Sequence, residues 1–140
     1  MSPGEGWKYV LSHDVLAALV EILSGEKFES NVKSHIFDPL GMEHSTFAHP
    51  IEDWEDFARQ YSYNAKTGQF MPLYSHVCHL GTEYVSGGGG CVSTVEDYNK
   101  FLEALRVGDV ILKKQTVAMI AENRLTEQQW ATYSGRFSSM

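Results

Sequence analysis

The residues of this chain whose types and spacing suit nucleophilic chemistry occur in three short strings. A serine stands three residues before a lysine in "SGEK" (Ser24 and Lys27) and again in "SNVK" (Ser30 and Lys33), and "KTG" begins at Lys66. A serine attacks an acyl carbon only when a nearby base takes its proton, and on a helix a lysine three residues away lies on the same face. Each string therefore depends on the element that carries it.

None of the three strings is predicted to form a catalytic site. Gly25 ends the helix that carries Ser24, which breaks the helical spacing that would aim the lysine at the serine. On the next helix, Ser30 and Lys33 lie about 100 to 160° from the centre of the apolar stripe, on the solvent side. The "KTG" string falls in the polar turn of a predicted hairpin. A small independent hydrolase that uses Ser30 therefore has unsuitable geometry.

Four consecutive glycines at residues 87 to 90 raise the possibility of a phosphate site, which the neighbouring residues argue against. No Lys-Ser/Thr pair follows them, and Val92 occupies the position where a dinucleotide motif needs its third glycine. Glycine also allows a backbone to pass very close to another element. We expect this structural role, and we expect no nucleotide or other cofactor.

A metal site is not predicted either. The string "SHVCH" places His76 and Cys78 on one face of an extended segment, with His79 beside them, but two ligands do not complete a site. Cys78 and Cys91 are the only cysteines, which is too few for a disulfide framework. Packed or surface histidines are the simpler interpretation.

The N-terminal half is predicted to contain two helices and a hairpin. Apolar residues cover most of the helical wheel from 15 to 23, which indicates a central, buried helix with Ser12 as its N-cap and Gly25 at its end. A second, amphipathic and peripheral helix is predicted from 27 to 36, closed by the following "DPLGM" because Asp38 precedes Pro39. Alternation within 56 to 73 around a turn at "AKTG" predicts a hairpin.

The C-terminal half is predicted to be helical. Ser93 and Glu96 have the spacing of a capping box, and an apolar stripe then continues to Gly108. A further helix is expected from 114 to 122, and Thr126 with Gln129 repeats the capping-box spacing.

Size and charge restrict the kinds of partner. The 140 residues fit one domain, so residues 1 to 140 are expected to form a single unit. A net charge of -7 and no basic cluster longer than Lys113-Lys114 argue against nucleic-acid or anionic-membrane binding. The longest apolar run is about half a membrane span, and the first residues lack the pattern of a signal peptide. No membrane partner and a cytoplasmic default are expected, although the sequence leaves the compartment unknown.

Residues 3 to 47, "PGEGWKYVLSHDVLAALVEILSGEKFESNVKSHIFDPLGMEHSTF", resemble the serine hydrolases of the class C β-lactamase, DD-peptidase and esterase family. In that family a Pro-Gly turn leads to a catalytic tyrosine, a buried helix that ends in SG, a helix that ends in PLGM, and a Thr-Phe segment. The matching positions are Pro3-Gly4, Tyr9, Ser24-Gly25, Pro39 to Met42 and Thr46-Phe47. The resemblance resumes at "SGGGGCVSTVEDYNKFLEAL", which is similar to the family's glycine-rich segment and following helix.

The resemblance implies a fold and a chemistry. The fold is a helix-rich α+β one, namely the helical region of a β-lactamase-like fold with a short antiparallel hairpin and without most of the family's central sheet. The chemistry is hydrolysis of a small-molecule ester or amide through an acyl-serine, and of the family's catalytic residues only Tyr9 has a match, as the general base. Val10 and Leu11 follow it where lactamases and peptidases have a small residue and Asn, which favours the esterase-like branch.

Two family motifs lack a counterpart in the expected order. The SxxK nucleophile box should lie well before the tyrosine, and only eight residues precede Tyr9; the closing KTG or HxG strand has no match between Val110 and Met140. We therefore expect this chain to be the middle portion of such a hydrolase and to be inactive by itself. We also expect it to be encoded by an open reading frame that begins inside the parent gene. A truncated product, an excised domain and a genome remnant all remain open. The alternative is a non-catalytic module that binds partners or forms homo-oligomers through exposed apolar surface.

Overall fold

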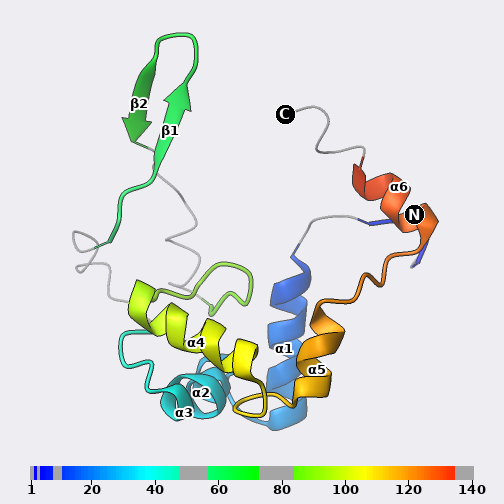
Figure 1. Ribbon diagram of the computed structural model, residues 1–140. Coiled ribbons are helices and arrows are strands. Elements are labelled where there is room, and N and C mark those ends of the chain that lie inside the picture. Colours follow the sequence, from blue (N-terminus) through cyan, green and yellow to red (C-terminus); the bar gives the residue numbers. More distant parts are fainter. Residues whose placement is uncertain (1, 3, 8–10, 48–56, 73–83, 135–140) are drawn as a thin grey trace.

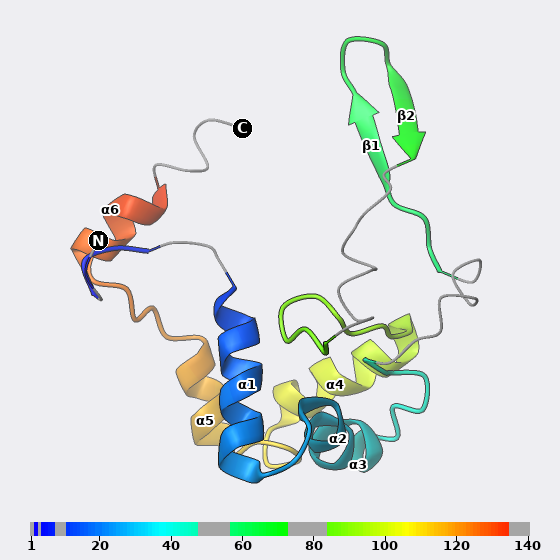
Figure 2. The same ribbon diagram turned by 180° about the vertical axis from the view of Figure 1, so that it is seen from behind.

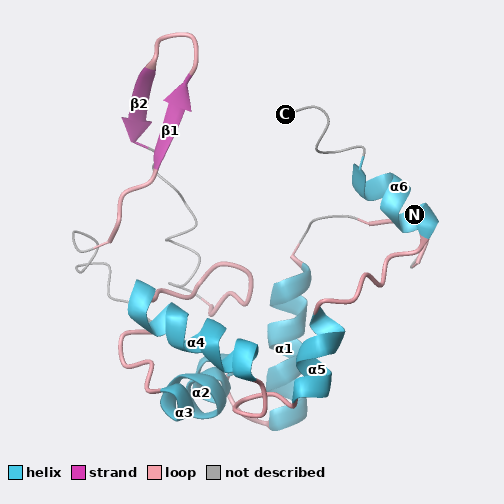
Figure 3. Ribbon diagram, in the orientation of Figure 1, coloured by secondary structure: helices cyan, strands magenta, loops and turns pink. Residues whose placement is uncertain are grey.

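The computed structural model describes residues 2, 4–7, 11–47, 57–72 and 84–134 of the chain. These residues form a helix-rich α+β structure with one antiparallel hairpin, as predicted (Figures 1 and 3). The elements are α1 (Ser12–Ser24), α2 (Phe28–Val32), the π-helix η1 (Lys33–Phe37), α3 (Asp38–Leu40), β1 (Tyr61–Asn64), β2 (Gln69–Pro72), α4 (Val95–Val107), α5 (Lys114–Ile120) and α6 (Glu127–Ser134).

Helix α1 occupies the predicted residues, but its surroundings differ from the prediction. It ends at Gly25, whose φ of 72° is the left-handed conformation that glycine tolerates. Its N-cap is Leu11, so Ser12 is the first helical residue and makes no capping hydrogen bond. Ala17 is the buried residue of the helix. The large apolar side chains on its other faces are 45 to 78% exposed: Val15, Leu16, Leu19, Ile22 and Leu23.

The prediction that α1 is central and buried is therefore wrong for the part of the chain that the structure describes. The wheel is apolar on most sides, which is the pattern of a helix surrounded by protein. The side that carries Ala17 meets the glycine-rich segment, the C-terminal part of the helix meets α2, and α5 is drawn next to the helix in both views (Figures 1 and 2). Composition indicates that a helix needs burial, but it does not say which polypeptide supplies the cover.

Helices α2, η1 and α3 follow one another without a break from residue 28 to 40. The expected end at residue 36 is wrong, because the helical chain passes Pro39 and ends at Leu40, with Gly41 as its C-cap at φ 62°. Pro39 has no N–H to donate, and it lies directly after the π-helical turn η1, where Asp38 N donates to Lys33 O. Met42 N then donates to Phe37 O at 2.9 Å and closes the turn.

The described core lies between this helical run and α4. Phe37, Met42 and Phe47 are buried and form one cluster. The Phe37 and Phe47 rings are stacked with centroids 6.0 Å apart, and the Phe28 ring meets Phe47 edge to face at 5.1 Å. The predicted apolar stripe of the second helix packs against the cluster together with residues of other elements: Phe28, Val32, Ile36, Leu40, Val85 and Phe101. The prediction of an amphipathic, peripheral helix is confirmed.

The hairpin forms at the predicted place. Strands β1 and β2 pair antiparallel from Tyr61 opposite Pro72 to Asn64 opposite Gln69, so residues 65 to 68 make the turn. Figure 1 shows the hairpin standing apart from the helices. The "KTG" string is thus an exposed turn, as predicted.

The cap of α4 differs from the predicted one by a single residue. Its N-cap is Thr94, whose side-chain oxygen accepts a hydrogen bond from Asp97 N at 3.2 Å. Ser93 and Glu96 therefore do not form the capping box. Ser and Thr are both good N-cap residues, so the local sequence does not distinguish a helix capped by Ser93 from one capped by Thr94.

Helix α6 begins with the predicted capping box. Thr126 N donates to Gln129 Oε1 at 2.9 Å, and Gln129 N donates to Thr126 Oγ1 at 3.2 Å. The helix also meets the N-terminal segment, since Trp7 N donates to Thr132 Oγ1 at 2.8 Å. Among the described residues no helix is long and apolar enough to span a bilayer.

Candidate functional site

The glycine-rich segment is fastened to the first turn of α1. Ser86, only 1% exposed, donates its hydroxyl hydrogen to Asp14 Oδ1 at 2.7 Å. The same hydroxyl oxygen accepts a hydrogen bond from Gly88 N at 3.2 Å, and Ser86 O accepts from Gly90 N at 3.1 Å. We call Asp14, Ser86 and Gly87 the α1 clip.

Gly87 passes so close to α1 that no side chain fits. A Cβ atom at this position would lie 2.6 Å from His13 O and 2.9 Å from Ala17 Cβ, below any ordinary contact distance. The backbone of Gly87 is not left-handed, so it is the space and not the dihedral angle that requires glycine. The prediction of a close backbone approach is confirmed.

The other end of the glycine-rich segment pairs with the segment after PLGM. Thr46 and Val92 form an isolated antiparallel bridge, with Thr46 N to Val92 O at 2.9 Å and Val92 N to Thr46 O at 2.8 Å. The Ser45 and Ser93 hydroxyls lie 2.8 Å apart beside it. The segment therefore links the start of α1 to the 41–47 segment.

A buried carboxylate on α4 fixes the 41–47 segment. Asp97 is 1% exposed, and its Oδ2 accepts hydrogen bonds from His44 N at 2.7 Å and from the Ser45 hydroxyl at 3.1 Å. Its Oδ1 pairs with Lys100 Nζ at 2.8 Å, and that ammonium group also donates to Gly41 O. Both carboxylate oxygens of this buried group thus have partners.

These partners also set the charge of Asp97. The hydrogen bond from Lys100 holds the pKa of the carboxyl group below its usual value, and the bonds from His44 N and Ser45 act in the same direction. Burial acts the other way but is outweighed. We therefore assign Asp97 a structural role as an ionised clamp and not as a proton donor.

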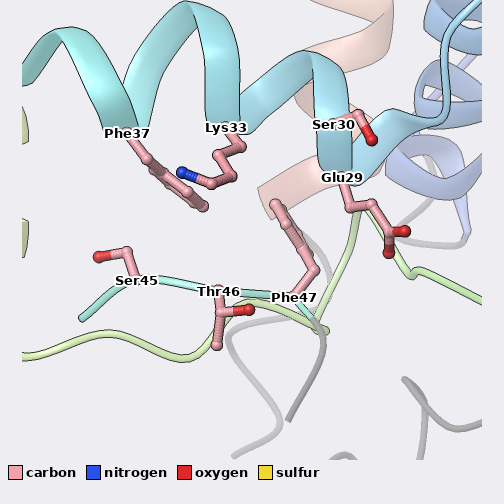
Figure 4. A pocket seen from close by; sticks show the side chains of 7 residues that line it. All are labelled: Glu29, Ser30, Lys33, Phe37, Ser45, Thr46 and Phe47. Carbon is pink, nitrogen blue, oxygen red and sulfur yellow. The ribbon is translucent and has the colours of Figure 1, made fainter. Parts of the chain in front are cut away.

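A pocket of about 250 Å³ lies between the α2–η1 helical run and the 45–47 segment. It is lined by Glu29, Ser30, Lys33, Phe37, Ser45, Thr46 and Phe47 (Figure 4). In this view the Ser30 hydroxyl and the Lys33 amine point in opposite directions. The amine of Lys33 pairs with the Asp38 carboxylate, and both side chains are more than half exposed. The lysine is thus not placed to take the serine proton, in agreement with the rejection of "SNVK".

Several residues considered from the sequence lie outside the described part of the chain. Tyr9 is one of them, as are His76, Cys78 and His79. Within the described residues, no three His, Cys, Asp or Glu side chains are grouped to hold a metal ion.

Sequence reasoning missed three residues that organise the site: Asp14, Ser86 and Asp97. A usable signal existed for Ser86, since a small polar residue directly before a glycine run can bond the loop it enters. For the two aspartates the sequence offers only helical positions. Their partners are 53 and 72 residues away in the chain.

Comparison with known proteins decides the family. Residues 1–139 match the family model described as Beta-lactamase. The chain belongs to the Beta-lactamase family. Esterase EstB from Burkholderia gladioli is 32% identical to it over 124 residues, which cover 75% of this chain and 30% of the esterase. The unguisins hydrolase ungD from Aspergillus violaceofuscus is 31% identical over 93 residues, 65% of this chain and 16% of that hydrolase.

Solved structures of other proteins superpose on this chain and have the same fold. Unliganded simvastatin synthase (LovD) from Aspergillus terreus superposes with a TM-score of 0.81 at 26% identity, over 99% of this chain and 35% of the synthase. EstCE1, a hydrolase with promiscuous acyltransferase activity, superposes with a TM-score of 0.69 at 25% identity, over 84% of this chain and 35% of EstCE1. The chain thus spans about a third or less of the length of these relatives. It has a partial β-lactamase-like fold, and its neighbours include esterases and acyltransferases.

Proposed function

We propose that this chain, acting as a single unit from residue 1 to 140, forms the tyrosine arm and helical part of an enzyme that hydrolyses a small-molecule ester or amide through an acyl-serine. The observation that carries the proposal is the family match over residues 1–139. Tyr9 is the proposed general base, because it occupies the position of the family's catalytic tyrosine. A phenol held near a serine can take its proton as the serine attacks the acyl carbon.

The acyl-accepting serine of this proposal lies on polypeptide outside the chain. Two described serines have SxxK spacing: Ser24 donates its hydroxyl hydrogen to Val20 O, and Ser30 faces away from Lys33, whose amine is held by Asp38. We therefore propose that the chain alone has no turnover. The exposed apolar faces of α1 are then where the remaining part of the fold packs.

The test is to supply that remaining part. We expect activity on an activated ester when this chain is mixed with the complementary portion of a family relative, and we expect Tyr9→Phe to lower the rate about 100-fold or more. Phenylalanine keeps the ring but removes the hydroxyl group that moves the proton. The rate of ester hydrolysis is the measurement.

Two controls make this test specific. Tyr63→Phe removes a hydroxyl group from the exposed hairpin and should leave the rate unchanged. Incubation of the chain alone with a fluorophosphonate should leave its intact mass unchanged, while a complete family hydrolase gains one adduct. Full activity of Tyr9→Phe would show that Tyr9 is not the base, and an adduct on the chain alone would show that it holds its own nucleophile.

A second candidate function, self-association, rests on the exposure of α1. Ile22 and Leu23 are 78% and 77% exposed, and Met119 and Ile120 of α5 are also exposed. Helix α5 runs beside α1 (Figure 2). A second copy of the chain could cover these side chains, since contiguous exposed apolar surface promotes association.

Light scattering during size exclusion measures this second function directly. Self-association predicts a mass above the 15.7 kDa of one chain, and Ile22→Gln with Leu23→Gln should return the mass toward that value. Val95→Gln is the matched control, because Val95 is 88% exposed but stands at the start of α4. A single-chain mass at high concentration would rule self-association out.

A further inference from the structure

The glycine-rich segment is held at both ends by hydrogen bonds to distant parts of the chain. At its start, the Ser86 hydroxyl donates to Asp14 Oδ1 on α1 at 2.7 Å, across 72 residues of chain. At its end, Val92 exchanges two backbone hydrogen bonds with Thr46, at 2.8 and 2.9 Å. Figure 1 shows the segment as the loop that lies between α1 and α4. It therefore connects the start of α1 with the 41–47 segment.

Hydrogen bonds inside the segment tie its two ends together. Gly88 N donates to the Ser86 hydroxyl oxygen at 3.2 Å, and Gly90 N donates to Ser86 O at 3.1 Å. Gly90 is buried, and a Cβ atom there would lie 3.0 Å from Ser86 O, so this turn is tightly closed. Ser86 thus holds both the α1 clip and the turn that leads to Val92.

The contacts continue from Val92 into the 41–47 segment. The Ser45 hydroxyl lies 2.8 Å from that of Ser93 and donates to Asp97 Oδ2 at 3.1 Å. Ser86 and Asp97 are each 1% exposed, so both ends of this chain of contacts are shielded from water. A buried polar group that loses its partner is left unsatisfied, so the contacts favour staying closed together.

We propose that the glycine-rich segment makes the start of α1 and the 41–47 segment one cooperative unit, in which a change at the α1 clip is passed to Thr46 and Val92. Continuous hydrogen bonds and closely packed backbone carry coupling of this kind. Elements joined in this way open together, with one free energy of opening for the whole unit. The unit is therefore a conformational device built into the fold.

The coupling gives α1 an effect at a distance, and this part of the inference rests on the proposed function. In that function the remaining part of the fold packs on the apolar faces of α1. A partner that holds α1 in place also restrains the α1 clip and, through it, the 41–47 segment. Ser45, Thr46 and Phe47 line the pocket described above, so docking on α1 also steadies one wall of that pocket.

Amide hydrogen exchange of the full chain, followed by NMR, tests the coupling without turnover. Ser86→Ala removes the hydrogen bond of the α1 clip, and we expect exchange at Thr46 N and Val92 N to become about tenfold faster. In the other direction, Ser45→Ala should speed exchange at Gly90 N, which donates to Ser86 O. Unchanged exchange at Thr46 N and Val92 N in folded Ser86→Ala protein would overturn the proposal.

A second pair of variants reaches the same bond from α1. Asp14→Ala removes the acceptor of the Ser86 hydroxyl hydrogen and should speed exchange at Thr46 N and Val92 N as Ser86→Ala does. Asp14→Asn keeps an oxygen that accepts this hydrogen, so most of the wild-type protection should return. An Asp14→Asn variant that exchanges as fast as Asp14→Ala would show that the hydrogen bond is not what couples the two ends.

Reference amides and a matched variant separate coupling from global unfolding. Gly68 N in the hairpin turn and Trp130 N in α6 have backbone hydrogen bonds outside the unit, and their exchange should not change. An equal rise there would mean that the ends are linked only by unfolding of the whole chain, against the proposal. Ser24→Ala removes a hydroxyl group from the far end of α1. If it speeds exchange at Thr46 N as much as Ser86→Ala does, the α1 clip is not the route.

A measurement with the complementary portion of a family relative distinguishes this proposal from the function beneath it. When that portion docks on α1, exchange at Thr46 N and Val92 N should slow in the wild type and slow less in Ser86→Ala. Equal slowing in both proteins would contradict the coupling and leave the proposed function intact. If the portion neither binds nor restores activity, the proposed function fails, and the effect of Ser86→Ala on the chain alone still decides the coupling.

Discussion

Replacing Gly87 with alanine is expected to lower the free energy of unfolding by roughly 2 to 3 kcal/mol, because the added methyl group has no room. Its carbon would lie 2.6 Å from His13 O, a backbone atom that cannot turn aside as a side chain can. Either α1 or the glycine-rich segment must shift, and the shift strains the Asp14 to Ser86 hydrogen bond. The unfolding temperature should fall by about 10 °C, which thermal denaturation followed by circular dichroism measures.

The neighbouring glycine provides the control for this prediction. A Cβ atom at Gly88 would have Asp14 Oδ2 as its nearest neighbour at 3.4 Å, an ordinary contact with a side-chain atom. Gly88→Ala should therefore change the unfolding temperature little, since neither space nor backbone angle requires glycine there. Equal losses in the two variants would mean that loop entropy, and not the approach to α1, decides the effect.

Replacing Asp97 with alanine is expected to lower the unfolding temperature by about 5 to 10 °C, because it removes a buried acceptor with several partners. His44 N and the Ser45 hydroxyl lose their bonds, and Lys100 keeps only Gly41 O as a partner. The 41–47 segment should loosen first. Hydrogen exchange at His44 N, compared between wild type and variant, reports that loosening.

The same carboxylate predicts a pH dependence of stability. The hydrogen bonds from Lys100 and the other donors lower the pKa of Asp97 in the folded chain. As the pH falls, the unfolded chain therefore binds a proton at Asp97 before the folded chain does. The contribution of Asp97 is complete above a pH of about 4 and is lost as the pH falls through the lowered pKa. In Asp97→Asn this acid-dependent part should be absent.

Glu103 on the same helix offers the matched comparison. It pairs with Arg106 at 2.6 Å, but both side chains are more than half exposed. An exposed pair of this kind contributes little, so Glu103→Gln should barely alter the unfolding temperature. A loss equal to that of Asp97→Ala would contradict the assignment of Asp97 as the buried clamp.

Local patterns predicted much of the fold because their causes are local. Gly25 ends α1 by its left-handed backbone, "AKTG" forms the hairpin turn, and Thr126 with Gln129 caps α6. The N-cap of α1 was predicted one residue late, and two further boundaries were predicted wrongly, at Pro39 and at the cap of α4. At the cap of α4 two adjacent registers satisfy the same rule, and the hydrogen bond from Asp97 N to Thr94 Oγ1 marks the one that forms. At Pro39 the usual bias against a helical residue before proline did not hold, because Asp38 keeps helical backbone angles.

The burial of α1 shows a different limit. Its apolar pattern indicates a helix enclosed by protein, and the described chain leaves Val15, Ile22 and Leu23 largely exposed. An apolar pattern predicts that a helix face is buried, but it does not show whether the residues that bury it belong to the same polypeptide. The relatives, of which this chain spans about a third or less, contain the additional length.

The sequence by itself determined the family, the helices and hairpin, and the need for glycine beside another backbone, because these depend on residue type and on near neighbours in the chain. Only the tertiary structure decided that Gly87 meets His13, that Ser86 binds Asp14 and that Asp97 holds the 41–47 segment. It also turned Ser30 and Lys33 away from each other. Those contacts join residues far apart in sequence, and no local preference specifies which distant partner a buried polar group will find.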